Sequence, residues 1–266
     1  MRIFTRISLL TLVCVNFGFS FDLNSFAKDV ISGVKDNSTK ESNTTLSNST
    51  ITDGLKETLK IGVNYAVETL GKENGYLNNS LVKIPLPENL QKAETIIRKV
   101  GGDKVADELI ASMNKAATQA APKTADIFVK AIEKMSLEDA KKILEGNNNA
   151  ATEYFKTNTS SSLKSVIKPI IEKTMEQNSV AGYYDSFNSY YKQYAKDYVN
   201  STSVMSLAKN FGVDSYLPSS SDENLNDYVT QKAIDGLFSM IAKKEAAIRE
   251  NPVEQTTSLL KQLFSK

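Results

Sequence analysis

The spacing of apolar residues is the feature that most constrains how this chain folds. From Thr52 onward, apolar side chains recur every three or four positions, as at Leu55, Leu59, Val63 and Val67. This spacing places side chains on one face of an α-helix. The sequence shows neither an alternation of strand and helix patterns nor a fixed-period repeat. We therefore predict an all-α protein, in which residues 52–266 form a single irregular multi-helix bundle of about eight to ten helices with no significant sheet.

Glycine, proline and capping residues divide this pattern into segments. Helices are predicted over residues 52–71, 87–100, 103–121, 124–135, 136–145, 182–198, 222–250 and 253–264, and shorter helical pieces over residues 150–155, 163–175 and 204–211. Ser136 and Asp139 resemble a capping box, and Pro169 is expected to kink a helix or to start one. The two prolines in residues 81–87 exclude a central strand. We interpret this segment either as a stiff strut laid across helices or as a docked, peptide-like recognition arm.

Residues 1–20 have the layout of a secretory signal peptide. Arg2 and Arg6 supply positive charge, residues 7–15 form a short apolar core, and Gly18 and Ser20 are small residues at a cleavage site. The apolar core is too short to span a bilayer comfortably, although an uncleaved anchor is the alternative. We predict export and cleavage after Ser20, which leaves a soluble mature protein in the periplasm of a Gram-negative bacterium.

Two segments are predicted between the signal peptide and the bundle. Residues 21–35 have the pattern of a short amphipathic helix. Residues 36–51 are rich in Ser, Thr and Asn, and such a segment has too little apolar surface to offset the entropy of ordering. We therefore predict a flexible linker there.

Composition excludes several kinds of chemistry. The chain has no histidine, which removes the Ser-His-Asp triad, the imidazole base and histidine-based zinc sites. Signal cleavage would remove Cys14, the only cysteine, and would leave Arg98 and Arg249 as the only arginines. So little guanidinium argues against nucleic-acid binding. We predict no catalytic residue, no metal, no cofactor and no transmembrane segment in the mature chain.

Two patterns that occur in catalytic sites are present in the sequence, but both are also expected on the solvent-exposed faces of amphipathic helices. Ser-x-x-Lys occurs eight times, without the companion motifs of penicillin-recognising enzymes. Adjacent acids such as Glu138 and Asp139 fall in the first turn of a predicted helix, where the helix dipole favours negative charge. The sequence does not exclude a catalytic pair of carboxylates that the fold brings together from distant helices. An uncharacterised enzyme that uses carboxylate, Tyr or Lys groups is therefore kept as an alternative function.

The best-localised candidate site is an aromatic helix over residues 182–198. Six of the eleven tyrosines and one phenylalanine fall on about one third of its surface. These residues are Tyr183, Tyr184, Phe187, Tyr190, Tyr191, Tyr194 and Tyr198. A dry core would use Leu or Ile, whereas each tyrosine hydroxyl needs a partner or water. The stripe is either a groove or interface that binds a ligand or partner, or a tyrosine-rich edge of the core.

Asp107 and Asn114 form a second candidate site. They stand seven positions apart among small residues, which places them close to one face of a helix. They either line a groove where helices approach closely or form buried interhelical hydrogen bonds that fix packing.

Several ordered segments together resemble a known family. They are residues 54–59, 83–87, 107–117, 121–122, 127–128, 139–144, 150–155, 228–230, 236–238, 248–252 and 259–261. In this order and spacing the chain is similar to the bacterial family called domain of unknown function 4197, over about residues 52–264. The resemblance implies a bacterial, exported, helical protein. It carries over no activity, catalytic residue or ligand.

These observations favour a non-catalytic binding module. We expect its ligand to be an amphipathic small molecule or an unidentified protein partner, held along the helix grooves. A structural protein of envelope assembly is a further alternative, which predicts a large exposed patch of Tyr and Leu instead of a cavity. Oligomeric state does not follow from the sequence.

Overall fold

The helical periodicity of the sequence is realised as a series of helices in the computed structural model, which describes residues 47–195 and 222–264. They are α2 (Asn48–Gly71), α3 (Glu88–Lys99), α4 (Asp103–Ala120), η1 (Ala121–Thr124), α5 (Ala125–Glu133), α6 (Leu137–Glu145), α7 (Ala150–Gln177), α8 (Val180–Tyr190), η2 (Tyr191–Ala195), α11 (Asp222–Glu250), η3 (Pro252–Glu254) and α12 (Ser258–Phe264). Neither described range contains a strand. The predicted all-α fold is confirmed.

Capping chemistry sets several helix boundaries. Ser136 accepts a hydrogen bond from the backbone N–H of Asp139, whose carboxylate in turn accepts from the backbone N–H of Ser136. This complete capping box starts α6, and Gly146 follows its last residue. Ser47 caps α2 through Thr50, so that helix begins at Asn48, inside the segment predicted as linker. Local side-chain bonds of this kind locate helix ends to within a residue or two.

Helix α7 is longer than the apolar pattern predicted. The sequence predicted two pieces, because no apolar residue stands between Phe155 and Leu163. In the structure Thr159 takes the missing position: its side chain is buried, and its hydroxyl donates to the carbonyl of Phe155 at 2.7 Å. Pro169 lies inside the helix on its exposed side. The carbonyl four residues earlier lacks its usual N–H donor; it belongs to Ser165, which is also exposed, and the helix continues past the proline.

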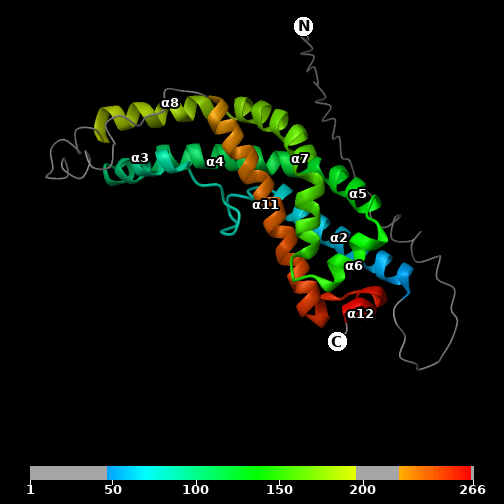
Figure 1. Ribbon diagram of the computed structural model, residues 1–266. Coiled ribbons are helices and arrows are strands. Elements are labelled where there is room, and N and C mark those ends of the chain that lie inside the picture. Colours follow the sequence, from blue (N-terminus) through cyan, green and yellow to red (C-terminus); the bar gives the residue numbers. More distant parts are fainter. Residues whose placement is uncertain (1–46, 196–221, 265–266) are drawn as a thin grey trace, which may run out of the picture. The chain divides into compact units, whose positions relative to one another are not determined.

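The core is formed mainly where α11 crosses α2 and α7, and where α4 packs against α7 and α8 (Figure 1). The rings of Phe128 and Phe155 meet edge to face at 5.2 Å between centroids, and Phe238 lies 6.1 Å from Phe128 in the same manner. Such aromatic pairs add roughly 0.5–1.5 kcal/mol beyond their buried area. Helices α5, α7 and α11 therefore meet through one aromatic cluster.

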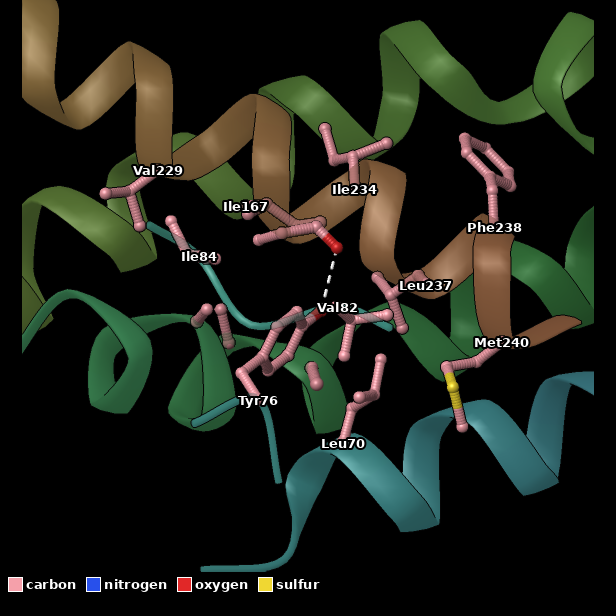
Figure 2. Close-up of a cluster of buried hydrophobic side chains, with 14 of the residues drawn as sticks. Leu70, Tyr76, Val82, Ile84, Ile167, Val229, Ile234, Leu237, Phe238 and Met240 are labelled. Atoms are coloured by element: carbon pink, nitrogen blue, oxygen red, sulfur yellow. Dashed lines mark hydrogen bonds between the residues drawn. The ribbon is translucent and has the colours of Figure 1, made fainter. Parts of the chain in front are cut away.

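Tyr76 ties the connection after α2 to α11. Its side chain is fully buried, and its hydroxyl donates to the backbone carbonyl of Ala233 at 2.7 Å (Figure 2). A Cβ on Gly236 would lie 2.7 Å from a ring carbon of Tyr76, so only glycine allows this approach. Burial raises the pKa of the Tyr76 phenol above its ordinary value.

The proline-containing segment runs between α4 and α11. Val82, Ile84 and Leu86 are buried, whereas Lys83 and Pro85 between them are exposed. Its inner side chains join the same apolar cluster as Tyr76 (Figure 2). The segment therefore belongs to the core of the bundle through alternate residues.

Several predictions fall outside the described residues. They are the signal peptide at 1–20, the short helix at 21–35, residues 36–46 of the linker, Tyr198 and the helical piece at 204–211. No helix within the described ranges is long and apolar enough to cross a membrane.

Candidate functional site

The aromatic stripe of α8 and η2 turns most of its rings inward. Tyr184, Phe187 and Tyr191 are buried in the core. Tyr183 and Tyr190 are partly buried and pack against it. Tyr194 is different, because 47% of its surface is exposed. Within the described part of the stripe, the structure therefore places one ring where it can meet a partner.

Tyr190 is seated on the turn between α3 and α4. Its hydroxyl donates to the backbone carbonyl of Val100 at 3.0 Å. A Cβ on Gly102 would come within 2.6 Å of a Tyr190 ring carbon and 2.4 Å of the Ile97 side chain. Glycine at this position is what lets the tyrosine ring lie directly against the backbone of the turn.

The turn itself follows a recognised helix-ending geometry. Gly101 has a φ of 84°, its N–H donates to the carbonyl of Arg98 at 3.2 Å, and the N–H of Gly102 donates to that of Ile97 at 2.9 Å. These two bonds form a Schellman motif, in which a glycine takes the left-handed conformation. The turn that receives Tyr190 is thus built by Gly101 and Gly102 in separate roles.

Tyr194 stacks on Tyr190. The two ring centroids are 4.7 Å apart, with the ring planes tilted by 46°. Tyr194 belongs to the π-helical turn η2, Tyr191–Ala195, and such turns occur often at functional sites. We call Tyr190 and Tyr194 together the aromatic platform. Tyr190 is anchored to the fold by its hydroxyl, and Tyr194 is nearly half exposed.

Asp107 lies in an ion-pair network beside the same turn. The guanidinium of Arg98 donates to the carboxylates of Asp107 at 2.6 Å, Asp103 at 3.3 Å and Glu94 at 3.0 Å. The hydrogen bond to Asp107, with those to the other two acids, raises the pKa of the Arg98 guanidinium further above its ordinary value. Asp107 is about two-thirds exposed. Its carboxylate joins the start of α4 to the end of α3.

Asn114 is completely buried, under the proline-containing segment. Its side-chain oxygen accepts from the backbone N–H of Ile84 at 2.8 Å, and its amide nitrogen donates to the carbonyls of Ile84 and Ile110, each at 2.8 Å. The side chain thus pairs with Ile84 as a neighbouring strand would. The expected buried hydrogen bonds exist, although they join a helix to an irregular segment.

The two polar candidates on α4 therefore do not share one site. Asp107 faces Arg98 near the turn, whereas Asn114 is covered by Ile84 two helical turns further along. The structure brings Asp107 close to the segment that receives Tyr190, and it places Asn114 in the core.

Glu245 and Arg249 form a buried ion pair that was not predicted from the sequence. The Glu245 carboxylate accepts from the backbone N–H groups of Ala151 and Thr152, each at 2.9 Å, and from the hydroxyl of Thr152 at 2.8 Å. Arg249 lies 3.0 Å from the same carboxylate and donates to the carbonyl of Ile143 at 2.8 Å. Their side chains are only 3% and 8% exposed.

This ion pair is a structural joint. Glu245 caps the first turn of α7, because the preceding residue Asn149 makes no capping bond with its side chain. Arg249 satisfies a carbonyl near the end of α6. The sequence held one signal for it: Glu245 stands between Ile241 and Ile248 on the apolar face of its helix. A charge at such a position points to a buried partner.

Among the residues that the structure describes, no three acidic or cysteine side chains gather closely enough to hold a metal ion. Asp107, Asn114 and Glu245 are each engaged by partners that join helices or hold the core segment. Of the candidate residues, Tyr194 of the aromatic platform is exposed without a hydrogen bond or ion pair that joins helices within the described ranges.

An all-helical protein with an anchored aromatic pair at its surface is the class that these observations define. The chain belongs to the family described as protein of unknown function DUF4197, whose model matches residues 45–265. No curated protein and no solved structure matches the chain. The family resemblance noted from the ordered segments is thereby confirmed.

Proposed function

We propose that this protein is an exported, non-catalytic binding module that holds an amphipathic ligand or a protein partner on the aromatic platform. The exposed ring of Tyr194, stacked at 4.7 Å on the anchored Tyr190, is the observation that carries this function. Tyrosine offers a large apolar face with a polar tip, and its side chain loses little conformational entropy on binding.

The anchoring of Tyr190 supports the proposal. Because its hydroxyl is bonded to Val100 and its ring rests on Gly102, Tyr190 is held in place before any ligand arrives. Pre-organisation lowers the entropic cost of association. A rigid inner ring beneath an accessible outer ring suits a binding contact better than it suits a dry core.

The roles of the polar candidates favour binding over catalysis. Asp107 is paired with Arg98, and Asn114 holds Ile84. Each of these side chains is therefore committed to a contact that shapes the fold. The alternative of an enzyme needs a carboxylate, Tyr or Lys group directed at a substrate, and no such assignment follows from these contacts.

Export is part of the proposal and rests on residues 1–20. Their charged start, short apolar core and small residues at a cleavage site are typical of a secretory signal. Expression in a Gram-negative host followed by mass measurement of the periplasmic fraction tests it. A mature chain that begins at Phe21 is expected, and a full-length chain held in the cell would contradict it.

The binding function is tested by native mass spectrometry of the protein, purified without refolding from the periplasm of the bacterium that produces it. We expect a reproducible adduct or a bound second chain on the wild type and a loss of at least about tenfold in its occupancy in Tyr194→Ala, the effect of removing a hot-spot aromatic. Val253→Ala is the matched control, because Val253 is 83% exposed at the turn between α11 and α12. Equal occupancy in both variants, or a bare wild-type chain, would contradict the proposal.

A further inference from the structure

The aromatic platform depends on a turn that the local backbone does not fully determine. The Schellman bonds end α3, but the next helix starts without a side-chain cap, since Gly102 occupies the N-cap position of α4. The N–H groups of Val105 and Ala106 donate to the carbonyl of Gly102, at 3.1 and 3.3 Å. With two successive glycines at the joint, the direction in which α4 leaves the turn needs another restraint.

Arg98 supplies contacts of the required kind. It lies in the last turn of α3, and its guanidinium reaches Asp103 and Asp107 in the first two turns of α4. Glu94, one helical turn earlier on α3, accepts from the Arg98 Nε at 3.0 Å and so orients the guanidinium. A planar group with several fixed donors holds such geometry better than a lysine ammonium does.

The same joint carries both contacts of Tyr190. The Val100 carbonyl, which accepts from the Tyr190 hydroxyl, lies before the glycines, and Gly102, on which the ring rests, is the N-cap of α4. A change in the angle at the joint therefore moves the two contacts relative to each other. Tyr194 follows, because it is stacked on Tyr190.

We propose that Arg98 is a positioning residue for the aromatic platform: by holding Asp103 and Asp107 across the glycine turn, it keeps the turn in the geometry that receives Tyr190. The inference rests on the proposed function only in treating Tyr190 and Tyr194 as a binding platform. The mechanical coupling between Arg98 and Tyr190 does not depend on ligand binding and can be tested without a ligand.

Amide hydrogen exchange of the full mature protein without ligand tests the coupling. In Arg98→Gln we expect the amides of Gly102, Val105 and Ala106 to exchange about five- to tenfold faster, with the amides of α7 and α11 unchanged. Lys142→Gln is the matched control: Lys142 pairs with Glu138 at 2.7 Å on a helix away from the turn. Equal exchange at the turn in the two variants would overturn the proposal.

A double-mutant cycle separates positioning from a general loss of stability. Tyr190→Phe removes the hydroxyl bonded to Val100, and it should accelerate the same three amides. If Arg98 acts through the joint that receives Tyr190, the effects of Arg98→Gln and Tyr190→Phe on these amides are non-additive. Additive effects would overturn the inference.

Two further variants keep the test decisive. Asp107→Asn removes the shortest of the three ion pairs of Arg98 by a change at an exposed side chain. It replaces Arg98→Gln in the test if that variant does not fold, and the exchange rates of the same amides should rise. Arg98→Lys retains the charge without the planar fork and should give an intermediate effect. A binding defect in Arg98→Gln with unchanged exchange at the turn would mean that Arg98 touches the ligand itself, against the inference. Accelerated exchange with intact binding would leave the inference standing and remove the platform from the proposed function.

Discussion

Replacement of Asn114 by alanine should be among the most damaging single changes in α4. The Asn114 side chain is fully buried and makes three hydrogen bonds, two of them with the backbone of Ile84. Its removal leaves the N–H and carbonyl of Ile84 buried without partners. Each such group costs roughly 1–3 kcal/mol, so for the two together we expect a loss of about 2–6 kcal/mol in the free energy of unfolding.

The bond to Ile110 adds little to this sum, because that carbonyl lies within α4 and faces an intrahelical donor. A loss of this size is a large part of the stability of an ordinary domain, about 5–15 kcal/mol. Urea unfolding followed by far-ultraviolet circular dichroism measures it, with the dependence on urea concentration unchanged.

Ser112→Ala is the matched control for Asn114→Ala. Ser112 is buried in the same helix, but its hydroxyl bonds only to the carbonyl of Leu109 in that helix. We expect this variant to stay within about 1 kcal/mol of the wild type. If Asn114→Ala also costs less than about 1 kcal/mol, the view that this side chain holds residues 83–86 in the core is refuted.

Two other predictions concern charged groups that join helices. Glu245→Ala should lower the free energy of unfolding in urea by about 3–5 kcal/mol, because it leaves Arg249 buried without its counter-ion and the first turn of α7 without its acceptor. The control is Glu138→Gln, which breaks an exposed ion pair. A similar cost in the two variants would contradict the prediction. Hydrogen bonds from Ser136 hold the pKa of the Asp139 carboxyl below its ordinary value. Its contribution is therefore present above the unfolded-state pKa and lost as the pH falls through the lower folded-state value. In thermal melts at a series of pH values, the stability difference between wild type and Asp139→Asn should therefore shrink below about pH 4. A difference that stays constant with pH would show that the capping box does not depend on the charge.

The elements predicted best are those whose determinants lie close together in the chain. Ser136 and Asp139 are three positions apart and form the capping box that their spacing indicated. The helix predicted over residues 87–100 is ended by Gly101 and Gly102, although the second role of these glycines beneath Tyr190 was not visible in the sequence. Local signals of this kind carry their physical cause within one or two helical turns.

The apolar pattern was less informative where a polar residue occupies a core position. Thr159 continues the buried face of α7 because its methyl group packs inward while its hydroxyl bonds to Phe155. A prediction that counts only apolar residues therefore ends the helix before this position. The same limitation hid Glu245, whose charge is neutralised and hydrogen-bonded by groups from other helices.

The aromatic stripe shows what periodicity leaves undecided. The spacing placed its rings on one face of a helix, and Tyr184 and Phe187 are indeed on a buried side. Spacing alone did not distinguish the buried rings from Tyr194, which is nearly half exposed. That difference depends on where α3 ends and α4 begins, because Tyr190, against which Tyr194 packs, is bonded to Val100, 90 positions earlier in the turn between those two helices.

The sequence by itself determined that this chain is helical, where most of its helices begin and end, and to which family it is similar, because periodicity and capping act over a few residues. Only the tertiary structure decided the partners of its polar side chains. Asn114 bonds to a residue 30 positions away, Tyr190 to one 90 positions away and Glu245 to one 94 positions away. Buried polar groups must find partners wherever packing brings a complementary group within about 3 Å, and a sequence pattern with a period of a few residues contains no information on that distance.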